Sequence, residues 1–135
     1  MTASTPSDVE HRLTRVLGGW AVASVVAGAA LAVSPRTRGF GRQTAAWGAV
    51  DGAIALVGAR RRAQRGPTDP VRLRRVLLVN VALDAGYVAI GAGLTRRERW
   101  RGDGVAVLVQ GAFLLVLDTA AAAVLREGRD EATAG

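Results

Sequence analysis

Four long apolar blocks separated by clusters of arginine constrain this chain more than any other feature. The blocks cover residues 13–33, 44–59, 76–94 and 104–125. A helix needs roughly 20 predominantly apolar residues to cross a bilayer, within a range of about 17–25. The first, third and fourth blocks reach this range directly, and the second reaches it when residues 40–43 join it. We therefore expect transmembrane helices at about 13–33, 41–59, 76–94 and 104–125.

The pattern argues against a soluble four-helix bundle, whose helices need polar outer faces. Half of the 135 residues are hydrophobic and 21% are charged, yet the charges gather between the blocks rather than along them. Such segregation is typical of an integral membrane protein. We predict an all-α, polytopic membrane protein, with a four-helix transmembrane domain at residues 11–127 and disordered cytoplasmic tails at residues 1–10 and 128–135.

The arginines predict the orientation. All 18 basic residues are arginine, and four spans place both termini on one side of the membrane. Eleven arginines border that side and seven the other; the eleven are Arg12, Arg15, seven between residues 60 and 75, Arg126 and Arg129. By the positive-inside rule we expect a multi-pass protein of a bacterial inner (plasma) membrane with both termini cytoplasmic. Because the arginines flank apolar spans, their expected partners are anionic lipid headgroups and not nucleic acid.

The two halves of the chain resemble each other. The segment "HRLTRVL" at 11–17 matches "VRLRRVL" at 71–77, and Gln43-x7-Asp51 matches Gln110-x7-Asp118. We infer a bundle built from a tandem two-helix repeat. The first block also fits a cleaved signal peptide, because Ala30-Leu31-Ala32 follows a basic region and an apolar core. Since this block forms half of a repeat unit, we expect it to remain as a helix.

Three aspartates interrupt the predicted spans. Asp51 lies nine residues before Arg60, Asp84 nine after Arg75, and Asp118 eight before Arg126. At 1.5 Å per residue, each carboxyl group is roughly 12–14 Å from the arginines. The hydrocarbon is about 30 Å thick, so all three are expected near its midplane, at one depth. Ser24, nine residues after Arg15, completes this predicted polar layer.

Further polar residues lie near the same helix faces. Asn80 precedes Asp84 by one turn and Tyr87 follows it, while Gln43 and Gln110 lie two turns from Asp51 and Asp118. We predict Asp51, Asp84 and Asp118 as proton- or cation-binding residues. The supporting polar residues are Ser24, Gln43, Asn80, Tyr87 and Gln110. Close helix approach is expected along three small-residue motifs, which are Ala23-x3-Ala27, Gly48-x3-Gly52 and Ala85-x3-Ala89-x3-Gly93.

Two functional classes follow from this layer. Three carboxylates with no basic residue inside any span cannot all ionise without repelling one another, so they share protons or admit a cation. This predicts a proton- or cation-linked small transporter or channel, as a homo-oligomer because four helices are few for a transport path. In the alternative, the acids are neutral and hydrogen-bonded, and the protein is a non-catalytic membrane scaffold or accessory subunit.

Catalytic chemistry finds little support in the residues. The only histidine, His11, lies in the polar N-terminal region, and the chain has no cysteine. A Ser/His/Asp set, a transition-metal site and a phosphate-binding glycine loop are therefore not expected. Carboxylates can do acid–base work, so an intramembrane enzyme stays a third class. We expect no enzyme, cofactor or metal, and we interpret Trp20, Trp47 and Phe113 as packing or lipid-facing residues.

Two segments, "LLVNVALDAGYVAIGAGL" (77–94) and "GDGVAVLVQGAFLLVLD" (102–118), resemble a family of small, uncharacterised four-helix bacterial integral membrane proteins. An Asn-x3-Asp-x2-Tyr helix of that family corresponds to Asn80, Asp84 and Tyr87. A Gln-Gly-x-Phe-Leu-x3-Asp helix corresponds to residues 110–118, from Gln110 to Asp118. The resemblance implies the four-helix architecture and carries no activity.

Overall fold

The computed structural model describes residues 5–134, without the side chains of residues 129, 131, 132 and 134, and the fold over that range is helical throughout. The elements are α1 (Pro6–Ala32), α2 (Arg38–Arg65), α3 (Pro70–Thr95), a short 3-10 turn η1 (Glu98–Trp100) and α4 (Arg101–Ala134). The predicted all-α class and its four helices are confirmed.

Local chemistry at the helix ends explains where the helices begin and end. Thr5 and Asp8 form a capping box at the start of α1, with Pro6 in the first turn. Asp69 caps α3 by accepting a hydrogen bond from the Arg72 N–H at 2.9 Å. Gly66, with φ of 75°, ends α2 in a conformation that side chains disfavour.

Two predicted irregular regions are wrong. The arginine-rich segment 60–75, which lies between the second and third predicted spans, is a loop only at residues 66–69, because arginine favours helix and extends α2 and α3. The predicted disordered tails are helical where they are described: residues 6–10 belong to α1 and residues 128–134 to α4. The capping box at Thr5 is the sequence signal for the early start of α1. Residues 1–4 and 135 lie outside the described range.

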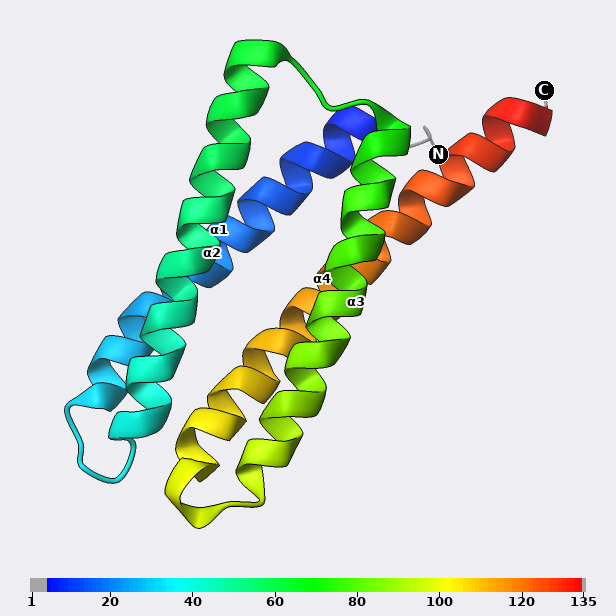
Figure 1. The fold of residues 1–135 in the computed structure, drawn as a ribbon. Helices are drawn as coiled ribbons and strands as arrows, with labels where there is room; N and C mark the ends of the chain where they lie inside the picture. Colours follow the sequence, from blue (N-terminus) through cyan, green and yellow to red (C-terminus); the bar gives the residue numbers. More distant parts are fainter. Residues whose placement is uncertain (1–4, 135) are drawn as a thin grey trace.

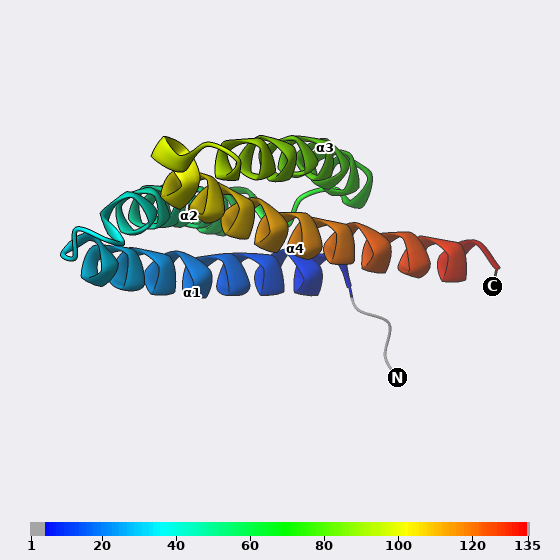
Figure 2. The ribbon, with the colours of Figure 1, turned by 90° about the horizontal axis from the view of Figure 1, so that it is seen from below.

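The helices form two antiparallel hairpins, α1–α2 and α3–α4 (Figure 1). Both termini and the 66–69 loop lie at one end of the bundle, and the turns at 33–37 and 96–100 lie at the other. α4 contacts all three other helices, and Figure 2 shows it between α1 and α3. The two hairpins correspond to the two units of the predicted repeat.

Glycine permits the close approach of helices within each hairpin. A Cβ at Gly91 of α3 would lie 2.6 Å from the Leu108 nitrogen of α4, and one at Gly28 of α1 would overlap the Ala45 backbone of α2. The predicted motif at Gly48 faces α1. The motif predictions for α1 and α3 are wrong, because their residues are exposed: Ala23, Ala27, Ala85, Ala89 and Gly93. Small residues four positions apart occur on several faces of such helices, so the motif alone does not identify the face that packs.

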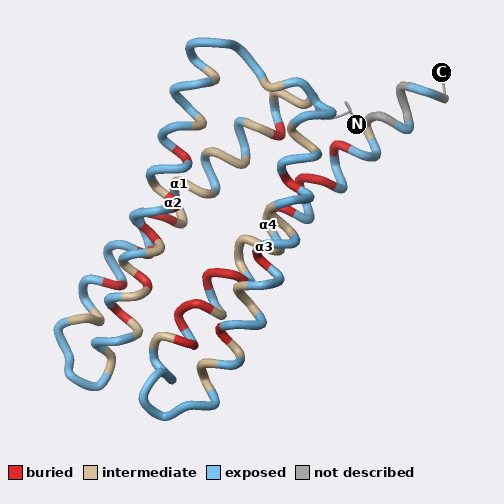
Figure 3. Tube along the Cα trace, in the orientation of Figure 1, coloured by how far each residue is buried: buried red, intermediate tan, exposed pale blue. Residues whose placement is uncertain are grey.

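Much of each helix is exposed (Figure 3); the buried residues include polar as well as apolar side chains, and many large apolar side chains face outward. Val22, Val26 and Val116 are more than 60% exposed, whereas Asp51 and Gln110 are the largest fully buried side chains. Three segments are long and apolar enough to cross a membrane: α1, α3, and Glu98–Gly128, which contains most of α4. This agrees with three of the four predicted spans; α2 lacks the required apolar window because Gln43 and Asp51 interrupt it.

At the end of the bundle that carries the termini, an apolar core and a loop contact link the helices. A small apolar core of Val9, Leu77, Ala121, Ala122 and Leu125 joins α1, α3 and α4 there. The α2–α3 loop is tied to α1, because Thr68 donates its backbone N–H and its hydroxyl to the Glu10 carboxylate, at 3.0 and 2.8 Å. These contacts hold the two hairpins together at one end.

We expect Gly91→Ala to lower the free energy of unfolding in detergent by about 1–3 kcal/mol, because its methyl group would collide with the α4 backbone. Gly86→Ala on the same helix is the matched control. A Cβ there meets nothing within 4 Å, so this change is neutral or stabilising by up to about 1 kcal/mol. Reversible unfolding followed by circular dichroism measures both. Equal stability of the two variants would contradict close packing at Gly91.

Candidate functional site

Six polar side chains are buried in the described part of the bundle, and they come from all four helices. They are Ser24, Thr44, Asp51, Asp84, Gln110 and Asp118. We call this set the polar seam, because it lies where the α1–α2 hairpin meets α3–α4. Five of its members were predicted from the sequence. The other three predicted residues, Gln43, Asn80 and Tyr87, are only half-buried.

The three aspartates are brought together, as predicted. Asp51, Asp84 and Asp118 are 1%, 4% and 8% exposed and come from α2, α3 and α4. The charge of Asp118 reaches both of the other carboxylates, and that of Asp51 reaches Asp84. The sequence places no basic residue between residues 43 and 59, 76 and 95, or 102 and 125. The acids therefore face one another without a cation within their own spans.

Asp84 and Asp118 do not share one depth. Gly91 of α3 packs against Leu108 of α4, and Gly111 of α4 against Val88 of α3, a register that places Asp118 level with about residue 81 of α3. Asp84 is three residues beyond that position, or about 4.5 Å along the helix. The predicted single layer is thus stepped between these two acids. Asn80, predicted to support Asp84, lies against Asp118 instead.

Two of the carboxylates have an oxygen with no hydrogen-bond partner. Oδ2 of Asp51 and Oδ2 of Asp84 are both fully buried and accept no hydrogen bond from the described residues. Tyr87, the predicted donor to Asp84, packs edge-on against Trp47, with ring centroids 5.0 Å apart. A buried carboxylate normally has several donors. The free oxygens are therefore positions where a proton, or a group that carries one, is stabilised.

Beside the acids, Gln110 forms the best-satisfied part of the seam. Its Oε1 accepts a hydrogen bond from Trp20 Nε1 at 2.6 Å, and its Nε2 donates to Ser24 Oγ at 3.1 Å. Trp20 also stacks on Phe113, with ring centroids 4.0 Å apart. Ser24 was predicted level with the aspartates; it lies beside Gln110 and Gly48, about one turn from Asp51.

The sequence interpretation missed two residues of this region. Trp20 was treated as a packing residue, yet it is one turn from Ser24 and shares its face. Thr44 is 8% exposed, and its Oγ1 is buried without a partner, whereas the neighbouring Gln43 was chosen. Thr44 is seven residues, two full turns, before Asp51, and this spacing was the available signal.

The geometry does not gather the acids around a single point. Over residues 5–134, no group of three or more His, Asp or Glu side chains is arranged to hold one metal ion. Asp84 and Asp118 differ in height along α3 and α4, so a proton exchanged between these two carboxyl groups would move along the bundle axis.

The model of a family of unknown function (DUF6992) matches residues 16–119. This range is most of the chain, so the protein belongs to that family, and the resemblance to an uncharacterised family is confirmed. Every residue of the polar seam lies within the match. No curated protein and no solved structure shows significant similarity to the chain.

We expect Gln110→Ala to lower the free energy of unfolding by about 1–3 kcal/mol, because the half-buried Trp20 N–H then loses its acceptor. Ser24→Ala removes only the weaker bond and should cost about 0.6 kcal/mol. Unfolding in detergent measures both values. A Ser24→Ala loss as large as that of Gln110→Ala would contradict the assignment of the stronger contact to Trp20.

Proposed function

We propose that the chain is a multi-pass protein of a bacterial inner membrane, with four spans and both termini in the cytoplasm. The fourth span, α2, is supported by its pairing with α1 through the short turn at 33–37. Between its terminal arginines the helix has one charged residue, Asp51, which is 1% exposed, while Val50, Ile54 and Leu56 face outward at 49–57%. The excess of arginine on the side of the termini supports the orientation.

We further propose that this membrane protein is a small transporter or channel linked to protons. The observation that carries this proposal is the group of three buried aspartates, with a free oxygen on Asp51 and on Asp84. A protonated acid donates a hydrogen bond to the oxygen of a neighbouring carboxylate. The shared proton removes the repulsion between the two groups. Stepwise transfer between Asp118, Asp84 and Asp51 then moves charge along the bundle axis.

An oligomer fits this role better than a single chain. Four helices enclose a narrow seam, and a complete path for a larger substrate requires walls from a second copy. The apolar outer faces of all four helices offer surface for such contacts, and the arginine-rich ends suit anionic lipid headgroups. The protein is proposed to act without catalysis, cofactor or metal ion.

A second function is favoured by the Gln110 network. Polar groups buried between helices often only stabilise a bundle, and Gln110 with Trp20 and Ser24 fits that description. If the aspartates act in the same manner, the protein is a membrane scaffold or accessory subunit. The two functions differ in one respect: a scaffold tolerates the loss of titratable groups, and a proton carrier does not.

We expect Asp84→Asn to abolish the dissipation of a pH gradient in reconstituted vesicles while leaving the protein folded and inserted. The amide keeps the shape and polarity of the carboxylic acid but cannot exchange a proton in this range. A pH-sensitive dye inside the vesicles measures the rate. Asp130→Asn, which changes an exposed carboxylate near the end of α4, is the matched control and should keep the parental rate.

Two results would count against proton linkage. A parent protein that leaves the gradient intact excludes uncoupled proton movement by this chain, and parental rates in Asp84→Asn show that the aspartate is structural. The double variant Asp51→Asn/Asp84→Asn tests the scaffold directly. If it keeps the fold, the oligomeric size and the parental rate of pH-gradient dissipation, the scaffold function is supported.

A further inference from the structure

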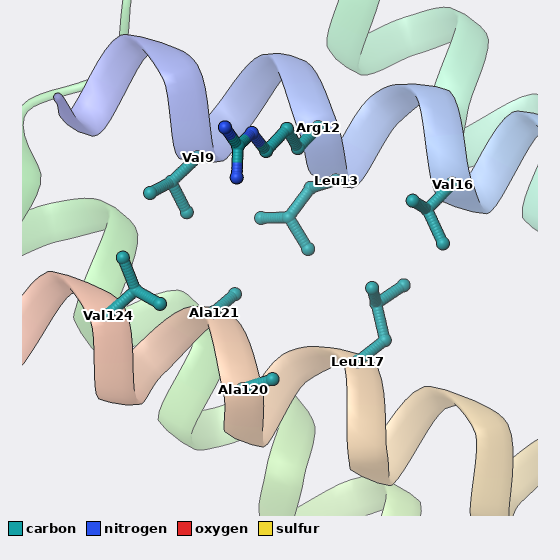
Figure 4. A pocket seen from close by; sticks show the side chains of 8 residues that line it. All are labelled: Val9, Arg12, Leu13, Val16, Leu117, Ala120, Ala121 and Val124. Carbon is teal, nitrogen blue, oxygen red and sulfur yellow. The ribbon is translucent and has the colours of Figure 1, made fainter. Parts of the chain in front are cut away.

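A groove between α1 and α4 lies outside the polar seam, at the end of the bundle that carries the termini (Figure 4). Its walls are apolar side chains of the two helices: Val9, Leu13 and Val16 from α1, and Leu117, Ala120, Ala121 and Val124 from α4. The side chains in Figure 4 point toward one another across an open gap. The two hairpins therefore leave an unfilled apolar groove at this end of their interface.

The dimensions of the groove decide what can fill it. Its volume is about 160 Å³, close to the roughly 150 Å³ of an apolar cavity that holds benzene. A helix with side chains is about 10–12 Å wide and does not fit. Val9 and Val16 are seven residues apart, so the groove runs for about 10 Å along α1. A segment of one flexible hydrocarbon chain fits a groove of this volume and length, with the rest of the chain extending beyond it.

The groove has one charged side chain, Arg12, which lies along its α1 wall between Val9 and Leu13 (Figure 4). Arg12 is exposed and donates no hydrogen bond to another described residue. The charge of Asp8 reaches it, but the nearest donor to that carboxylate is the Thr5 hydroxyl, at 2.6 Å. A cation beside an apolar channel complements an amphiphile with an anionic head. Basic pockets between spans on the cytoplasmic side bind such headgroups.

We propose that one anionic phospholipid occupies this groove, with an acyl chain between α1 and α4 and its phosphate on Arg12. The lipid fills the gap between the hairpins where protein packing leaves it open. This proposal rests on the membrane-spanning part of the proposed function and is independent of proton transfer. It assigns Arg12 a binding role that its neighbour Arg15, which does not line the groove, lacks.

The test uses the full chain in nanodiscs made from equal parts of phosphatidylcholine and phosphatidylglycerol. After mild detergent extraction, mass spectrometry counts the lipid that stays bound to each protein. We expect the parent to retain phosphatidylglycerol in preference. Arg12→Gln should reduce that preference about fivefold, and Arg15→Gln should leave it unchanged. Ala120→Phe, which fills the groove, should remove the retained lipid, whereas Ala123→Phe on the same helix should not.

Each other outcome overturns one part of the proposal. Equal losses in Arg12→Gln and Arg15→Gln mean that the arginines attract lipid diffusely, without a site. No effect of Ala120→Phe means that the groove holds no acyl chain. A change of oligomeric size in Ala120→Phe alone shows that a second copy covers the groove. Failure of the parent to enter nanodiscs refutes the membrane proposal itself, while entry without lipid preference refutes only the lipid site.

Discussion

Close backbone contact within each hairpin is the constraint on which the rest of the structure depends. Gly28 brings α1 against α2, and Gly91 brings α3 against α4, at separations that leave no room for a Cβ atom. Long polar side chains do not fit such contacts, so they lie between the hairpins, where Gln110 and the aspartates are buried. In a bilayer, packing and interhelical hydrogen bonds replace the hydrophobic drive between helices. Here backbone packing dominates inside the hairpins, and the hydrogen bonds of Gln110 to Trp20 and Ser24 connect one hairpin with the other.

The polar groups of the seam differ in how many of them have hydrogen-bond partners. On the side of the aspartates that faces the turns at 33–37 and 96–100, Gln110 is hydrogen-bonded to Trp20 and Ser24. Toward the termini, Asp51 and Asp84 keep free oxygens, and beyond them the apolar groove opens beside Arg12. A satisfied segment next to an unsatisfied one is a suitable setting for proton exchange, since only the second gains from an added proton.

Much of the architecture follows from the sequence, because apolar blocks of this length have few alternatives. The burial of Asp51, Asp84 and Asp118 was also predictable, because each is the only charged residue of its apolar block. Their stagger was not, since it depends on how α3 and α4 slide against each other at Gly91 and Gly111. The same register places Asn80 beside Asp118. The start of α1 before residue 11 was missed because the polar composition of this region hid the capping box of Thr5 and Asp8.

The central claim is that the buried aspartates share protons inside a bilayer, and infrared difference spectroscopy of the protein in lipid tests it most directly. The carbonyl band of a protonated carboxylic acid is separate from the bands of a carboxylate. We expect such a band at neutral pH, with an intensity that changes reversibly as pH is raised and with loss of the band in the variant that carries Asn at residues 51, 84 and 118. A spectrum without a protonated acid at neutral pH, or one unchanged in the triple variant, would contradict the account.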